Sequence, residues 1–233
     1  MPELREVKKD FFFLASRSDE AVAQTMVGLC ATRLPKNMGI PSDQIQVLTP
    51  TKKGFAGTAN LNKLLQASLN PPSPDKKERQ FGEFTFREGD RVMQIRNNYD
   101  IMWKKTDGSA IGNGIFNGDV GIIKSINPTM EELTVVFDDR EADYDFTQLN
   151  ELEPAYAMTV HKSQGSEYRA VVLAAWNGSP YLLNRSVLYT AITRARDLLI
   201  IVGNEETVAV MTQNKKVGRR YTGLKLRLQR KGA

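Results

Sequence analysis

The sequence has 233 residues, and its 32 lysines and arginines exceed its 27 aspartates and glutamates, which gives a formal net charge of +5. Hydrophobic residues at 41% and charged residues at 25% are ordinary for a folded chain, and they exclude wholesale disorder, a collagen-like repeat and a disulfide scaffold. With one cysteine and one histidine, we expect no metal site. No apolar run approaches the roughly 20 residues of a membrane span, and the N-terminus lacks signal-peptide features, so we expect a cytoplasmic protein without membrane contact.

The first 70 residues alternate between strand and helix patterns. An apolar run at 11–14 predicts a strand, and Ser18 predicts the start of a helix that Pro35 is expected to end. A buried strand at 45–48 and a second helix, ending before Pro71, follow. This order is typical of a parallel sheet covered by helices.

The middle of the chain changes to short strands in which apolar residues alternate with polar ones. Turn signals such as Asn127-Pro128 and Asp138-Asp139 separate them, and several such strands within about 60 positions favour a small β-barrel. The α/β pattern returns after Tyr156, with buried strands at 171–174 and 198–202. An α/β domain interrupted by a small β domain is therefore expected.

Three polar segments carry the functional signal. The segment 47–54 places Lys52 beyond the carboxyl end of a buried strand, which is the edge where ligands bind in open α/β sheets. The segment 159–167 reads TVHKSQGSE and lies ahead of another buried strand. The segment 189–196 reads YTAITRAR and places two arginines at the expected end of a helix.

Together these segments resemble motifs IV, V and VI of superfamily 1 (1B) DNA helicases, and the RecD-like family of exodeoxyribonuclease V alpha subunits and their stand-alone relatives above all. Three further segments are similar to that family: 89–92, 97–99 and 116–121. The resemblance implies the second RecA-like motor domain of the P-loop NTPase type, called 2A, with an inserted SH3-like barrel, called 2B. The expected division is 1–99 for the first part of 2A, 100–152 for 2B, and 153–233 for the second part of 2A with a basic C-terminal tail.

The phosphate-binding half of a motor is missing from the sequence. An ATPase needs a glycine-rich loop that ends in Gly-Lys-Ser/Thr, and none of the 17 glycines here is followed by lysine. The segment 135–139 (VVFDD) imitates a Walker B strand, but we interpret it as an acidic turn at the end of a barrel strand. We therefore expect the C-terminal half of a helicase that does not hydrolyse ATP by itself.

By resemblance, Arg194 is the catalytic arginine finger, which reaches the γ-phosphate of ATP across a domain interface. The ATP-binding set implied by the family also includes Lys52, Gly165 and Glu167. Glu167 would accept a hydrogen bond from the ribose, and Gly165 would supply a positive φ. Lys52 stands where the family commonly has arginine, and lysine lacks the bidentate fork. Mg²⁺ would be held mainly by the missing N-terminal motor domain.

The alternatives for these residues are structural. Arg194 could form a surface salt bridge, and Glu167 could be a solvated loop acid. Arg196, also in the third segment, is expected to support the fold more than the chemistry.

Polar side chains at five positions are expected to contact DNA: Asn97, Asn98, Thr159, His161 and Ser163. Amide, hydroxyl and imidazole groups often bind nucleic-acid backbones. Tyr99 adds a ring on which a base could stack, although the segment 97–99 fits a hairpin turn equally well. A packed structural role is the alternative for His161.

The family resemblance implies ATP-driven 5′ to 3′ translocation on single-stranded DNA with duplex separation. The implied partners are single-stranded and duplex-junction DNA, the N-terminal RecA-like domain of the same parent chain, and other exodeoxyribonuclease V-type subunits. From Lys215 to the end there are eight basic residues and no acidic one, which fits contact with a polyanion and a merely solvated terminus equally well. Two alternatives stay open: a non-catalytic module that binds nucleic acid or protein, and the helicase half of a conjugative relaxase.

Overall fold

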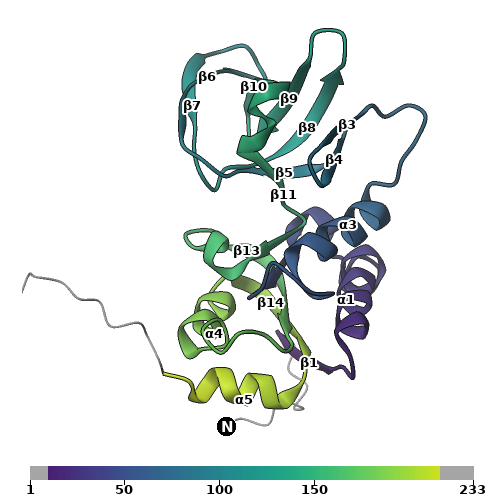
Figure 1. Ribbon diagram of the computed structural model, residues 1–233, viewed down its shortest axis with the longest axis vertical. Coiled ribbons are helices and arrows are strands. Elements are labelled where there is room, and N and C mark those ends of the chain that lie inside the picture. The colour runs from purple at the N-terminus through teal and green to yellow at the C-terminus, as the bar shows by residue number, and fades with distance from the viewer. Residues whose placement is uncertain (1–9, 216–233) are drawn as a thin grey trace, which may run out of the picture.

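The computed structural model describes residues 10–215, which form a parallel-sheet domain and a β domain (Figure 1). The parallel sheet has the strand order β1-β14-β13-β2-β12. Its strands are β1 (Phe11–Ala15), β2 (Ile45–Thr49), β12 (Ala157–Thr159), β13 (Tyr168–Ala175) and β14 (Ala195–Gly203). Every residue of β2 is buried, as expected for an inner strand that is covered on both faces.

Helices cover both faces of this sheet. On one face α1 (Asp19–Gly28) and α3 (Thr58–Leu69) pack against alternate residues of the inner strands, such as Val47 and Val172. On the other face α4 (Arg185–Ile192) and α5 (Glu205–Gln213) pack against the residues between them, such as Leu48 and Leu173. None of the helices within residues 10–215 is long and apolar enough to cross a membrane.

The helix that was expected to stop at Pro35 continues beyond it, so this prediction was wrong. A π-helical turn, Leu29–Arg33, follows α1, and α2 (Leu34–Met38) follows the turn. Pro35 lies in the first turn of α2, where the N–H that proline lacks has no helical partner to lose. The stop comes at Gly39, whose φ of 62° suits glycine.

The β domain is a seven-stranded antiparallel sheet in the order β11-β5-β8-β9-β10-β6-β7, and it curls around its own core (Figure 1). The strands are β5 (Arg91–Gln94), β6 (Asn98–Lys105), β7 (Ile111–Ile115), β8 (Val120–Asn127), β9 (Glu132–Phe137), β10 (Arg140–Asp145) and β11 (Leu152–Pro154). Its core includes the buried Phe137 and Tyr144, whose rings are in contact. A separate hairpin, β3 (Glu78–Phe81) and β4 (Phe84–Arg87), precedes it.

The predicted α/β fold with an inserted antiparallel domain is confirmed. The antiparallel sheet begins at Arg91, ahead of the expected 2B start at residue 100, because β5 pairs with both β8 and β11. The division into 1–99, 100–152 and 153–233 stays a prediction. The acidic turn expected after β9 is present, since Asp138 has a φ of 53° and Asp139 pairs with Lys105.

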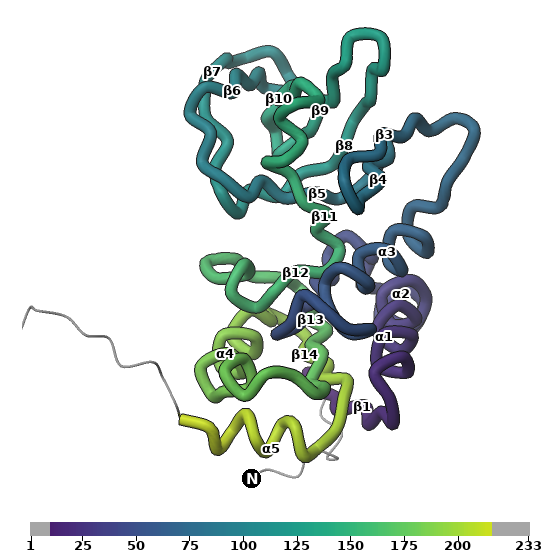
Figure 2. The backbone as a smooth tube through the Cα atoms, in the orientation of Figure 1, coloured from purple at the N-terminus to yellow at the C-terminus, as the bar shows by residue number. Residues whose placement is uncertain are grey.

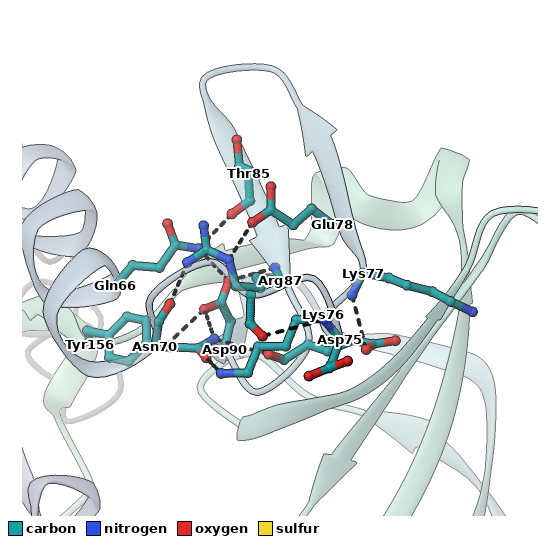
Figure 3. Close-up of polar contacts among 12 residues, drawn as sticks. Gln66, Asn70, Asp75, Lys76, Lys77, Glu78, Thr85, Arg87, Asp90 and Tyr156 are labelled. Carbon is teal, nitrogen blue, oxygen red and sulfur yellow. Dashed lines mark hydrogen bonds and ion pairs between the residues drawn. The ribbon is translucent and has the colours of Figure 1, made fainter.

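The chain crosses between the two domains near α3 and β11 (Figure 2), and a network of buried and partly buried polar side chains joins the domains there (Figure 3). Asp90 is 2% exposed, and its carboxylate accepts four hydrogen bonds. The donors are the amides of Gln66 (2.5 Å) and Asn70 (2.7 Å) in α3, the backbone N–H of Arg87 (2.7 Å), and the hydroxyl of Tyr156 (3.0 Å). One carboxylate thus links α3, the end of β4 and Tyr156 where the two domains meet, and burial raises its pKa.

The single cysteine is a buried core residue. Cys30 is 2% exposed, and burial raises the pKa of its thiol to about 12. Because the thiolate is the reactive form, we expect almost no reaction with a thiol reagent at pH 8 in the folded protein and complete reaction in denaturant. Absorbance with an aromatic disulfide reagent measures both, and rapid labelling without denaturant would contradict this placement.

Candidate nucleotide and nucleic-acid sites

All strands of the parallel sheet end on one side, here called the carboxyl edge, and begin on the opposite side, the amino edge. The predicted site residues lie at both edges. Lys52 follows the carboxyl end of β2, whereas Gly165 and Glu167 precede the amino end of β13. Arg194 precedes the amino end of β14, where Ala195 pairs with Tyr168. Because β2, β13 and β14 are parallel, the sheet separates Lys52 from the other three residues of the predicted nucleotide set.

Arg194 ties the end of α4 to the segment 159–167. Its guanidinium donates from Nη1 to the carbonyl of Ser166 (2.8 Å), from Nε to the carbonyl of Thr190 (3.2 Å), and from Nη2 to Oγ1 of Thr193 (3.2 Å). Its own carbonyl accepts from the backbone N–H of Tyr168 at 2.9 Å. Within residues 10–215 Arg194 forms no salt bridge with a carboxylate, which was the alternative considered for it.

The loop that Arg194 contacts has the backbone that the sequence predicted. Gly165 has a φ of 89°, so a glycine is required there. Glu167 is exposed and follows Ser166, whose carbonyl holds the Arg194 guanidinium. The amino edge therefore combines a guanidinium, an exposed carboxylate and a glycine backbone within one loop.

Arg196 differs from Arg194 in both exposure and contacts. Its side chain is 64% exposed, and its Nε donates to the neighbouring Asp197 carboxylate at 3.3 Å. The two arginines of the third segment thus occupy different environments, although the sequence presents them as a pair.

At the carboxyl edge, a small cavity of about 90 Å³ brings Lys52 together with Thr159. Lys162 also lines it, and the Lys162 ammonium pairs with the Glu153 carboxylate of β11 at 2.5 Å. Phe84, from the β3–β4 hairpin, borders the same cavity. The geometry thus groups Lys52 with a predicted nucleic-acid residue.

The three residues of the segment 159–167 that are predicted to contact DNA differ in their solvent exposure. Thr159 ends β12 and is partly exposed, and His161 is exposed on the following 3-10 turn. Ser163 is completely buried, and its hydroxyl donates to the carbonyl of Val160 at 2.8 Å. In this structure Ser163 therefore closes the turn and presents no donor at the surface.

Asn97 and Asn98 lie in the β domain, and their side chains support a turn. Oδ1 of Asn97 accepts from the backbone N–H of Asn117 at 3.0 Å. Oδ1 of Asn98 accepts from two backbone N–H groups of the following turn, and its amide nitrogen donates to Glu151 at 3.0 Å. These contacts are those of the hairpin-turn alternative. DNA contact by these amides stays a prediction.

Comparison with known proteins agrees with the motif assignment. Residues 61–137 match the family described as the ATP-dependent RecD-like DNA helicase SH3 domain, and residues 154–202 match the UvrD-like helicase C-terminal domain. The chain is therefore related to superfamily 1 helicases. Within that class it has the RecD-like architecture, in which an SH3-like domain is joined to the C-terminal motor domain, and this prediction from the motifs is confirmed.

Individual proteins that are similar in sequence to this chain are named RecD2 or RecD. The chain is 33% identical over 175 residues to the ATP-dependent RecD2 DNA helicase of Deinococcus radiodurans, a match that covers 75% of this chain and 22% of that protein. It is 35% identical over 121 residues to the RecBCD enzyme subunit RecD of Mycobacterium tuberculosis, covering 52% and 20%. The chain thus spans about a fifth of the length of these relatives.

Among solved structures, the chain is similar to the crystal structure of Pif1 helicase from Bacteroides in complex with ADP-AlF3 and ssDNA. The TM-score is 0.45 at 15% identity, and the match covers 92% of this chain and 50% of that one.

Proposed function

We propose that this chain is the second motor half of an ATP-dependent DNA helicase, and that it supplies an arginine finger, part of a nucleotide pocket and half of a DNA track. The observation that carries the proposal is the position of Arg194. Its guanidinium lies at the amino edge of the sheet and is bonded to the loop that carries Gly165 and Glu167. An arginine that acts across a domain interface has no need of a phosphate loop in its own domain.

The two edges of the sheet would have different ligands. ATP, bound mainly by another motor domain, would meet Arg194 and Glu167 at the amino edge. Nucleic acid would meet Thr159, His161 and Lys52 at the carboxyl edge. The segment 159–167 runs from the carboxyl end of β12 to the amino end of β13, so one short stretch of chain connects both ligands. Movement of this segment would couple nucleotide binding to the DNA contact.

The residues present fit part of an ATP site and leave the metal to another domain. Bound Mg²⁺ supplies charge neutralisation on the phosphates during transfer. Within residues 10–215, no cluster of three or more histidine, cysteine or acidic side chains is placed to hold a metal ion. The Glu167 carboxylate can accept hydrogen bonds from ribose hydroxyls, and the Arg194 guanidinium can donate to phosphate oxygens.

The proposal predicts weak, salt-sensitive binding of this chain to single-stranded DNA. Anisotropy of a labelled oligothymidine should give an affinity whose logarithm falls linearly with the logarithm of salt concentration, by about 0.7 per phosphate contacted. His161→Ala should weaken binding by about tenfold, because a donor to a charged phosphate is lost. Gln213→Ala, at the exposed end of α5, is the matched control.

An affinity that does not change with salt would contradict this picture. If His161→Ala and Gln213→Ala bound equally well, the carboxyl-edge track would lose its support. Binding to a protein but not to DNA would favour the non-catalytic module instead.

A further inference from the structure

Two aromatic side chains are exposed on the β domain, near the turn that the side chains of Asn97 and Asn98 support. Tyr99 in β6 is 66% exposed, and Phe116, just after β7, is 40% exposed. Their ring centroids are 5.5 Å apart with an interplanar angle of 70°, which is an edge-to-face pair. In such a pair, the ring that presents its edge keeps both faces clear of its partner.

Several local features hold these rings at the surface. The pairing of β6 with β7 is interrupted between Asn98 and Met102, and Tyr99 lies in this irregular stretch. Asn98 closes the turn there by accepting hydrogen bonds from two backbone N–H groups. An interrupted ladder lets a side chain point where regular pairing would not place it.

Phe116 is positioned by the backbone around it. Gly114 has a φ of 100°, and a Cβ at this residue would lie 2.9 Å from Cζ of Phe116. The ring therefore lies against a stretch of backbone that only glycine leaves free. The N–H of Phe116 donates to Oδ2 of Asp119 at 3.1 Å, which fixes the chain at this point. The pair is thus set by its surroundings, unlike a single exposed apolar side chain.

Polar residues that shortly precede Tyr99 in the sequence suit a nucleic acid. Arg96 is exposed and forms no ion pair within residues 10–215. Asn97 is exposed as well, and its carbonyl oxygen is engaged with the backbone of Asn117. An exposed guanidinium three residues before an exposed ring offers a group that can bind a phosphate and a face on which a base can stack. A proline-rich peptide would instead need rings that wall a groove, and an interplanar angle of 70° does not provide one.

The rings are also linked to the segment 159–167 through the strands between the domains. The N–H of Ile95 donates to the carbonyl of Glu151 at 2.8 Å, just before β11. In β11 itself, Glu153 forms the ion pair with Lys162 of that segment. The chain that leads to Tyr99 is thus paired with the stretch that runs into β11, and β11 contacts the segment 159–167.

We propose that Tyr99 and Phe116 form a stacking platform for unpaired nucleobases on the β domain. This inference rests on the proposed function and adds to it a site that contacts bases, whereas the carboxyl edge contacts the backbone. The platform would bind without sequence preference, because every base has a face that can stack.

The test compares an oligothymidine with an abasic oligonucleotide of the same length, using anisotropy and the whole chain. We expect the wild-type protein to bind the oligothymidine at least about tenfold more tightly than the abasic strand. Tyr99→Ala should lose that difference while its affinity for the abasic strand is unchanged, and Phe116→Ala should behave in the same way. Tyr99→Phe keeps the ring and should keep the difference.

Tyr181→Ala is the matched control, because Tyr181 is 89% exposed in the parallel-sheet domain. It should bind both strands as the wild type does. Circular dichroism and thermal unfolding establish that each variant is folded, and Tyr99→Phe keeps the test decisive if an alanine variant does not fold.

Three results would overturn the platform. Equal wild-type affinity for the two strands, with a normal salt dependence, would reject it and leave the proposed function standing. Undetectable binding to either strand would reject both. Unchanged DNA affinity in Tyr99→Ala, together with loss of binding to a proline-rich peptide, would assign the rings to a protein partner.

Discussion

Replacing Arg194 by alanine is expected to lower kcat for ATP hydrolysis by about a thousandfold in a protein that joins this chain to a phosphate-binding motor domain. This corresponds to about 4 kcal/mol of transition-state stabilisation. The guanidinium would meet charge that develops on the γ-phosphate, so ATP affinity should fall only modestly. Arg194→Lys should rescue little, since one ammonium group cannot reproduce the planar fork of donors that a guanidinium presents to phosphate oxygens.

The control for Arg194 is its neighbour Arg196, whose exposed side chain donates to Asp197. Arg196→Ala should keep near-normal turnover and also near-normal stability, in contrast to the fold-supporting role expected from the sequence, because its side chain is 64% exposed and exposed ion pairs contribute little. Arg194→Ala should unfold at a slightly lower temperature, since the Ser166 carbonyl loses its donor. Single-turnover hydrolysis at saturating ATP separates the two effects. Near-normal turnover in a folded Arg194→Ala protein would remove the finger assignment and leave this residue a structural tie.

Replacing Asp90 by alanine is expected to lower the free energy of unfolding by about 3 kcal/mol or more. The substitution removes the acceptor of the buried Asn70 amide, of the partly buried Gln66 amide and of the Tyr156 hydroxyl. Urea denaturation followed by circular dichroism measures the loss. Asp100→Ala changes an exposed carboxylate and should stay within about 0.5 kcal/mol of the wild type.

The pH dependence gives a second measurement on Asp90. Burial raises the pKa of this carboxyl above its ordinary value of 3.8, so the folded chain holds the proton more tightly than the unfolded chain does. Its contribution to stability is then fully present below pH 3.8 and is lost as the pH rises through the folded pKa. The stability difference between the wild type and Asp90→Ala should shrink over that rise. A difference that grows with pH would show that the carboxylate is stabilised as an anion.

The sequence predicted most of the fold because its signals are local. Ser18 was expected to begin a helix, and its hydroxyl accepts from the N–H of Ala21 at the start of α1. The apolar runs that predicted buried strands became β2, β13 and β14. Pro35 was misjudged, because a π-helical turn before it has no distinct sequence pattern.

The site was less predictable, because its residues are brought together by contacts between distant segments. The family resemblance grouped Lys52 with Arg194 in one nucleotide set. The sequence already indicated that the two lie at opposite edges of the sheet, because Lys52 follows a predicted strand and Arg194 precedes one. The sequence did not indicate that Ser163 is buried, because this residue lies in a polar segment. Asp90 lies in the segment 89–92 that resembles the family, but its role as a buried acceptor was not predicted, since its partners lie up to 66 residues away in the sequence.

The measurement that tests the account most directly is hydrogen exchange of this chain with and without single-stranded DNA. The account predicts slower exchange at the carboxyl edge, in the segments 51–58 and 157–163. It predicts no change at the amino edge, in the segments 164–168 and 190–196, where the nucleotide is expected to bind. Protection centred on the amino edge, or DNA binding that protects neither edge, would contradict the assignment of the two ligands to opposite edges of one sheet.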